Sequence, residues 1–249
     1  MAEIVYCEFL KLKRTRICLI AFLGTLVTPL LVFLLTLRHQ LTDSENFVSL
    51  FNLYDDAFVF LLLLFAPLTF SIVAAYLFSR EYAEKTLKTL FVVPISKKKF
   101  LVGKFITLLL CILLLMIFTW AELLILAVVW DILFAIQGLN WMGALYFLFK
   151  MLYGGLLLYA VITPVAYSAV YSRGFFVPIF IAAVIALSNV ILSGSPVAAF
   201  FPWTAAYLLV TNRIESAQGS PQAAFLIIGI VCFLSIWGSI KQFEKRDIS

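Results

Sequence analysis

Long apolar runs are the feature of this sequence that most restricts its fold. Six of them reach or approach the roughly 20 residues that a helix needs to cross a bilayer. They are 17–37, 57–78, 105–130, 143–171, 175–192 and 223–240. Only 12% of the residues are charged and 64% are hydrophobic, which excludes a soluble enzyme, a disordered tail and a nucleic-acid-binding domain. The sequence predicts an all-α, polytopic membrane protein with six transmembrane helices, in one domain over residues 1–249.

The positions of Lys and Arg predict the orientation of these helices. Most of the basic residues fall in the N-terminus, the loop after the second run, the turn after the fourth run and the C-terminal tail. With six spans these segments alternate onto one side, whereas the other side holds only Arg38 and Arg213. Because basic loops stay in the cytoplasm, both termini are expected to be cytoplasmic.

The first 16 residues are predicted to form a short helix at the cytoplasmic interface. Val5, Phe9 and Leu12 share one helical face, and an amphipathic helix of this kind can lie in the headgroup region. The alternative is a basic flank that only fixes topology. A cleaved secretory signal is not expected, because these residues are polar and no small-x-small site follows the first apolar run.

Residues 79–104 form the longest loop on the basic side and the most patterned one. Two Glu-to-Lys pairs at i, i+4 favour a helix, and an apolar stripe follows its period until Pro94 ends it. The pairs are Glu81–Lys85 and Glu84–Lys88, and the stripe is Ala83, Leu87, Leu90 and Phe91. Such a helix can dock into the groove of a soluble partner or lie on the membrane surface. The residues alone leave both open.

Two short motifs in this chain resemble a known family. The motifs are Glu8-Phe9-Leu10-Lys11-Leu12-Lys13-Arg14 at the N-terminus, and Arg80-Glu81, Lys85-Thr86-Leu87, Leu90, Pro94-Ile95-Ser96 and Gly103-Lys104 in the loop. They are similar to the N-terminus and the second-to-third-span loop of ABC-2 type transporter permeases, in the bacitracin-resistance and lantibiotic-immunity branch. This chain has Lys85 where the family commonly has Gly.

The resemblance implies a permease subunit of an ATP-driven transporter in a bacterial plasma membrane. It implies two permease subunits, identical or different, each placing a coupling helix into a separate ATP-binding cassette subunit that holds ATP and Mg. The expected contacts are Arg80, Glu81, Glu84, Lys85, Thr86, Leu87 and Leu90. It further implies a peptide antibiotic or lipid-like cargo, membrane lipid as surroundings, and a re-entrant segment, 196–210, in an extracellular loop, 194–222.

No catalytic motif is expected in this chain. Gly103-Lys104 is followed by Phe105, and position 98 is Lys rather than Gly, so the pattern of a phosphate-binding P-loop is missing. The four cysteines form no C-x-x-C pair and there is one histidine, so no metal site is predicted. The sequence therefore predicts a transport subunit without an ATPase site, cofactor or metal of its own.

Two charged residues fall inside the apolar runs. Glu122 and Lys150 lie at equal distances from the middle of the loop that joins their runs, so an antiparallel hairpin would place them at similar depth. We expect them to pair, either as a structural ion pair or with a substrate or proton role. A secondary transporter that uses Glu122 in a proton- or ion-coupled cycle is the alternative function.

Proline interrupts four of the apolar runs. Each such residue lacks an N–H and leaves a backbone carbonyl without its helical donor, which can seed a kink. The four are Pro29, Pro67, Pro164 and Pro178. Pro67 is of most interest, because a kink in the second span could carry a movement of the following loop into the membrane.

Overall fold

The computed structural model of the chain describes residues 1–42, 49–84, 86, 96–134, 140–215, 217 and 219–245. All secondary-structure elements assigned in these ranges are helices, so the predicted all-α class is confirmed. The α-helices are α1 (Ala2–Lys13), α2 (Ile17–Thr42), α3 (Leu50–Phe60), α4 (Ala66–Ala83), α6 (Lys97–Phe134), α7 (Trp141–Ser172), α8 (Phe176–Leu192), α9 (Pro202–Val210) and α10 (Pro221–Glu244). A π-helical segment, η1 (Leu61–Phe65), joins α3 to α4, and a 3₁₀ turn, η2 (Ala198–Phe200), precedes α9.

Five helical stretches in the described residues are long and apolar enough to cross a membrane. They are Ile17–Thr42, Leu50–Ala83, Lys97–Phe134, Trp141–Ser172 and Pro221–Glu244. The remaining predicted span, residues 175–192, corresponds to α8, which is apolar but has 17 residues. Within the predicted loop 79–104, α4 continues to Ala83 and α6 already begins at Lys97. Favourable Glu, Lys and Ala residues extend both helices beyond their apolar parts.

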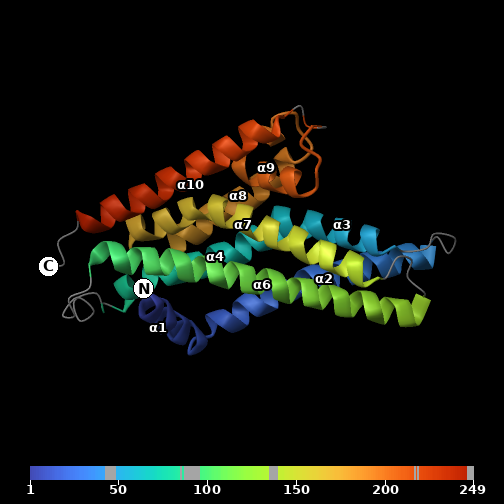
Figure 1. Cartoon of the computed structure of the whole chain (residues 1–249), viewed down its shortest axis with the longest axis horizontal. Coiled ribbons are helices and arrows are strands. Elements are labelled where there is room, and N and C mark those ends of the chain that lie inside the picture. The colour runs from blue at the N-terminus through green and yellow to red at the C-terminus, as the bar shows by residue number, and fades with distance from the viewer. Residues whose placement is uncertain are drawn as a thin grey trace.

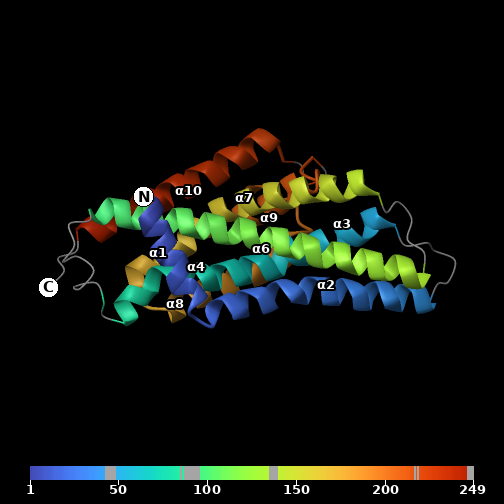
Figure 2. The ribbon, with the colours of Figure 1, turned by 60° about the horizontal axis from the view of Figure 1, so that its bottom comes forward.

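The long helices run side by side along the long axis of the molecule (Figures 1 and 2). α7 packs against α4, α6, α8, α9 and α10 and so lies at the centre of the bundle. α1, the end of α4, the start of α6 and the end of α10 gather at one end of the bundle. There Lys98 lies 3.3 Å from Glu244, and the rings of Phe100 and Phe243 are 6.2 Å apart. Three of the basic segments therefore share one end, as the predicted topology requires.

Side-chain caps begin four of the described helices; at the start of α6 the Ser96 hydroxyl accepts from the Lys99 N–H over 3.3 Å. The Asn140 side chain accepts a hydrogen bond of 2.6 Å from the Gly143 N–H at the start of α7. Ser49 caps α3 in the same way, and Ser220 caps α10 directly before a proline at the first helical position. These residues satisfy N–H groups that a helix start leaves without an internal acceptor.

The second span contains the π-helical segment η1 directly before Pro67. Because Pro67 has no N–H, the carbonyl of Leu63 four residues earlier lacks its ordinary helical donor. The side chain of Asn189 on α8 supplies one, with its Nδ2 donating to the Leu63 oxygen over 3.2 Å. Asn189 is fully buried, so an α8 side chain repairs the interruption in the second span.

The loop between the last two spans folds into η2 and α9. All residues of α9 from Trp203 to Val210 are buried, and the helix packs against α7 and α10. Figure 1 shows it beside the N-terminal end of α10. The predicted re-entrant segment is therefore a helix enclosed by protein, and its entry into the membrane stays a prediction.

Candidate functional site

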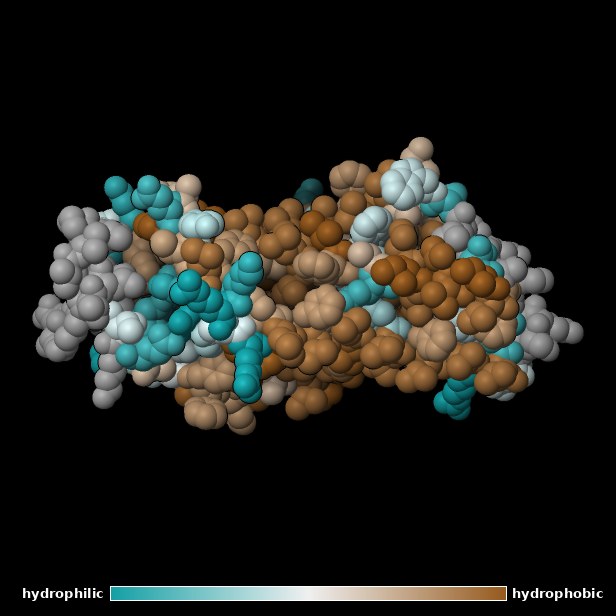
Figure 3. Space-filling view, turned by 90° about the horizontal axis from the view of Figure 1, so that it is seen from below, coloured by the Kyte–Doolittle hydropathy of each residue, from teal (hydrophilic) through white to brown (hydrophobic). Residues whose placement is uncertain are grey.

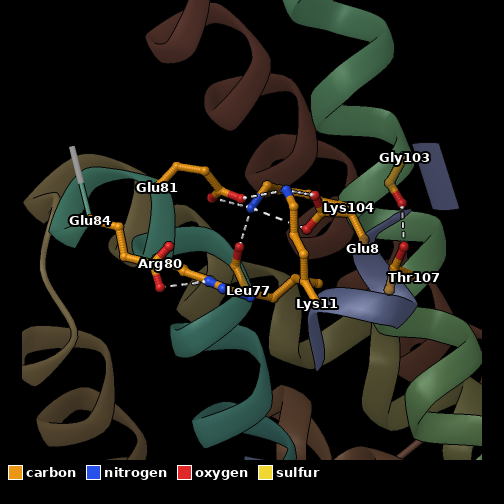
Figure 4. A network of polar contacts seen from close by, with 9 residues as sticks. All are labelled: Glu8, Lys11, Leu77, Arg80, Glu81, Glu84, Gly103, Lys104 and Thr107. Atoms are coloured by element: carbon orange, nitrogen blue, oxygen red, sulfur yellow. Dashed lines mark hydrogen bonds and ion pairs between the residues drawn. The ribbon is translucent and has the colours of Figure 1, made fainter. Parts of the chain in front are cut away.

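Four charged side chains from three helices meet where α4 ends and α6 begins (Figure 4). We call Glu8 and Lys11 of α1, Glu81 of α4 and Lys104 of α6 the charge network. Lys11 Nζ lies 2.5 Å from Glu8 Oε1 and 3.5 Å from Glu81 Oε1. Lys104 Nζ donates to Glu81 Oε2 and to the Leu77 carbonyl, and lies 3.6 Å from Glu8 Oε2. Each ammonium group thus contacts both carboxylates.

Most of the charge network is shielded from solvent. Glu8, Glu81 and Lys104 are 2%, 3% and 2% exposed. A buried charge is very costly unless it is paired, and this network balances two ammonium groups against two carboxylates. Burial acts to lower the pKa of Lys11, but the hydrogen bond and charge of Glu8, and then Glu81, outweigh it and raise the pKa above its ordinary value.

Close packing of α1 on α6 brings the charge network together. A Cβ atom on Gly103 would lie 2.6 Å from Cγ2 of Ile4, so only glycine lets α1 approach at this point. Lys104, the next residue, points its ammonium group between two aromatic rings, 5.2 Å from the ring centroid of Phe100 and 6.0 Å from that of Phe78. Rings at these distances attract a cation and enclose the pairs.

The residues predicted to contact a partner divide into two groups. Glu81 belongs inside the charge network and is buried, so its contact with a partner stays a prediction. Arg80 instead pairs at the surface with the exposed Glu84 over 2.8 Å, and the half-buried Thr86 donates its N–H to the Glu81 carbonyl over 3.1 Å. The remaining predicted contacts, Lys85, Leu87 and Leu90, lie outside the described residues, as does most of the predicted coupling helix.

Sequence reasoning did not assemble the charge network. It expected Glu81 to contact a partner, and it used Lys11 and Lys104 only within short sequence motifs and among the basic residues that predict topology. The sequence signal that could have indicated the network is the presence of opposite charges in these segments. Glu8 and Lys11 are spaced i, i+3 on one helix, and Arg80-Glu81 and Gly103-Lys104 flank the same loop. Only the fold shows that the two loop ends and α1 converge.

The expected Glu122–Lys150 pair is not formed among the described residues. Lys150 Nζ lies 3.6 Å from Asp55 Oδ1 and 4.8 Å from the ring centroid of Phe58. Glu122 Oε1 instead accepts a hydrogen bond of 3.4 Å from Thr25 Oγ1. The two residues turn to different neighbours, α3 for Lys150 and α2 for Glu122, because similar depth on two helices does not make their side chains face each other.

Asp55 links Lys150 to a third element at the end of the bundle away from the charge network. Its Oδ2 lies 3.8 Å from NH2 of Arg213, in the connection between α9 and α10. Asp55 and Arg213 are each about half exposed, so the pair is worth little by itself. Lys150 is nevertheless held by an ion pair with Asp55 and by contacts with aromatic rings, an arrangement that suits a structural role.

Long apolar helices with charges confined to a few paired positions define a multi-pass membrane protein. The profile of the ABC-2 family of transporter proteins matches residues 4–189, and the chain therefore belongs to that family. It is also 25% identical to the bacitracin transport permease protein BCRB of Bacillus licheniformis over 195 residues. This matched region is 78% of this chain and 91% of that relative. The family predicted from the two motifs is confirmed, and all four residues of the charge network fall in the matched region.

Proposed function

We propose that this ABC-2 permease is driven by a separate ATP-binding cassette subunit, which docks on the segment after α4 and holds ATP and Mg²⁺. The observation that carries the proposal is the charge network at the base of that segment. α4 ends at Ala83 and α6 begins at Lys97, and Glu81 and Lys104 tie these two helix ends together. A force applied to the segment therefore acts on a joined base rather than on two independent helix ends.

The charge network gives this coupling a physical basis. Removing one partner of a buried ion pair costs on the order of 3–5 kcal/mol, because the other charge is left uncompensated, whereas a surface pair is worth about 0–1 kcal/mol. A moderate push at the segment would thus move α4, α6 and α1 together before it broke the pairs. α4 continues through η1 into α3, so the same movement reaches the other end of the bundle.

The proposed docking surface consists of the residues around the end of α4 that do not belong to the charge network. Glu84 is exposed and Arg80 and Thr86 are half-buried; Lys85, Leu87 and Leu90 are also proposed contacts but lie outside the described residues. Docking from the cytoplasm requires both termini to lie there, in accord with the basic residues at that end. A second permease chain, of the same or a different sequence, is proposed to pack in the membrane beside this one.

The proposed cargo is a peptide antibiotic of the bacitracin or lantibiotic type, or a lipid-like molecule, which the transporter exports or clears. The support is the similarity of this chain to a bacitracin transport permease and the apolar character of the spans. Few residues within the spans are charged, and one of them, Lys150, is paired with Asp55. A small polar ion as cargo is therefore disfavoured.

Glu122 supports a second candidate function, a proton- or ion-coupled carrier. Its Oε2 is buried and finds no hydrogen-bond partner among the described residues. An ionisable side chain within a span is a candidate for proton transfer. This function predicts transport that depends on an ion gradient, persists without an ATP-binding subunit and is lost in Glu122→Gln.

A pull-down of the tagged full chain from mild detergent, with mass spectrometry of co-purifying chains, tests the main proposal. A soluble chain with a P-loop should co-purify in fixed ratio and be lost on Glu84→Ala plus Thr86→Ala. The matched control is Glu3→Ala plus Thr42→Ala, two exposed residues of the same types elsewhere, and both variants must elute as single sharp peaks. Recovery of the chain without any nucleotide-binding partner, from membranes in which other such complexes survive, would refute it.

A further inference from the structure

An apolar groove lies where α1 turns into α2. Its volume is about 280 Å³, and apolar or sulfur-bearing side chains from α1, α2, α4 and α6 line it. Phe9 and Leu12 of α1 and Ile17, Cys18 and Ala21 of α2 form the wall nearest the turn. Cys18 is exposed, so the groove opens to the outside. Small-molecule sites usually measure about 300–1,000 Å³, and this groove suits part of an extended hydrocarbon chain.

The turn between α1 and α2 carries a cluster of positive charge beside the groove. Lys13, Arg14 and Arg16 are exposed, and within the described residues none of the three forms an ion pair with an acidic side chain. They fall between Leu12 and Ile17, two residues that line the groove. Figure 3 views this side: hydrophilic residues gather toward one end, and hydrophobic surface begins directly beside them.

We propose that the groove and the basic turn form one binding site for an anionic phospholipid of the leaflet on the N-terminal side. One acyl chain lies in the groove, and the phosphate lies against Arg14 and Arg16. The positive charges favour an anionic lipid over the other possible occupants. A zwitterionic lipid gains little from the unpaired cations. A second copy of this chain would bring the same positive turn against them. Arginine suits phosphate because its planar group donates two parallel hydrogen bonds.

This inference depends only on the membrane location of the chain, so it stands or falls separately from the ATP-driven function. A consequence is that the lipid would hold α1 against α2, α4 and α6. Since α1 contributes Glu8 and Lys11 to the charge network, the lipid site and the network stabilise the same packing of α1.

Native mass spectrometry of the full chain, reconstituted with equal amounts of phosphatidylglycerol and phosphatidylcholine, tests the site. We expect one phosphatidylglycerol to be retained in preference to phosphatidylcholine. Each cation near a headgroup changes anionic-lipid affinity by about fivefold, so Arg14→Gln plus Arg16→Gln should reduce the preference by about 10- to 30-fold. The control Lys99→Gln plus Lys245→Gln removes two exposed charges from the same end and should retain the preference.

A second variant tests the groove itself. Cys18→Phe places a bulky side chain at the groove from its exposed side, and retention of the lipid should be lost. Cys7→Phe makes the same change at an exposed α1 position that does not line the groove and should have no effect. The proposal is overturned if the native chain retains both lipids equally, if the two charge variants act alike, or if Cys18→Phe instead dissociates a dimer.

Discussion

Replacing Lys104 with methionine removes one ammonium group from the charge network and keeps most of the volume of the side chain. Lys104 is 2% exposed and donates to Glu81 and to the Leu77 carbonyl. The substitution leaves the carboxylates of Glu8 and Glu81 buried and facing only Lys11, whose side chain is 32% exposed. The network then holds one positive charge against two negative ones.

The structure sets the size of the expected loss. Removing one partner of a buried ion pair costs about 3–5 kcal/mol, because the other charge remains buried without compensation. For a chain of this length 1 kcal/mol shifts the midpoint of thermal unfolding by about 2–4 °C, so the expected decrease is about 6–20 °C. Lys99→Met removes an exposed lysine from the same helix and should stay within about 0.5 kcal/mol of the native chain.

The assay is the fraction of detergent-solubilised protein that remains monodisperse after heating, measured by size-exclusion chromatography at a fixed heating time. Adding Glu81→Leu to Lys104→Met removes the second charge of the pair. The double variant should recover part of the loss, because it leaves one carboxylate opposite Lys11. The buried network is not what holds this junction together if Lys104→Met and Lys99→Met lower the thermal stability equally. The same conclusion follows if the losses of stability caused by Lys104→Met and by Glu81→Leu simply add in the double variant.

Three further predictions concern other contacts. Gly103→Val should displace α1, and limited proteolysis should then cut the N-terminal helix several-fold faster. Asn189→Leu removes the donor to the Leu63 carbonyl and should cost about 0.6–1.7 kcal/mol; in a Pro67→Ala background, which restores a backbone donor, the cost measured by thermal unfolding should largely vanish. Because the pKa of Lys11 is raised above its ordinary value, its stabilisation is complete below that ordinary value and is lost as pH rises through the higher folded-state pKa. Lys11→Met should therefore differ from the native chain at neutral pH, and the difference should shrink as alkaline pH deprotonates Lys11.

Properties that depend on long stretches of sequence could be predicted. The apolar runs predicted the helical spans. This prediction tolerates errors at the helix ends, because one turn more or less does not change whether a segment is apolar enough to cross a bilayer. Pro67 was also identified as a break, and the structure has a π-helical segment directly before it. That Asn189 repairs the break could not be predicted, because it requires the relative position of α8.

Properties that depend on the rotation of one helix about its axis could not be predicted. Equal depth suggested a pair between Glu122 and Lys150, but the contact partners are Thr25 and Asp55. A rotation of about 100° per residue decides which neighbour a side chain meets, and hydrophobic periodicity is uninformative where a helix is apolar on all sides. The long α6 is apolar around most of its circumference, so its sequence did not show which helix Glu122 faces.

The same rotation explains how two adjacent residues of the loop motif serve different purposes. Arg80 and Glu81 are about 100° apart around α4, so Arg80 pairs with Glu84 at the surface while Glu81 points inward to Lys104. Gly103 and Lys104 divide in a similar way, since one admits α1 and the other closes the charge network. Three described residues of the motif, Glu81, Gly103 and Lys104, therefore form an internal joint. Substitutions at Glu84 and Thr86 should change partner binding with the fold retained, whereas substitutions at Glu81 and Lys104 should impair partner binding and stability together.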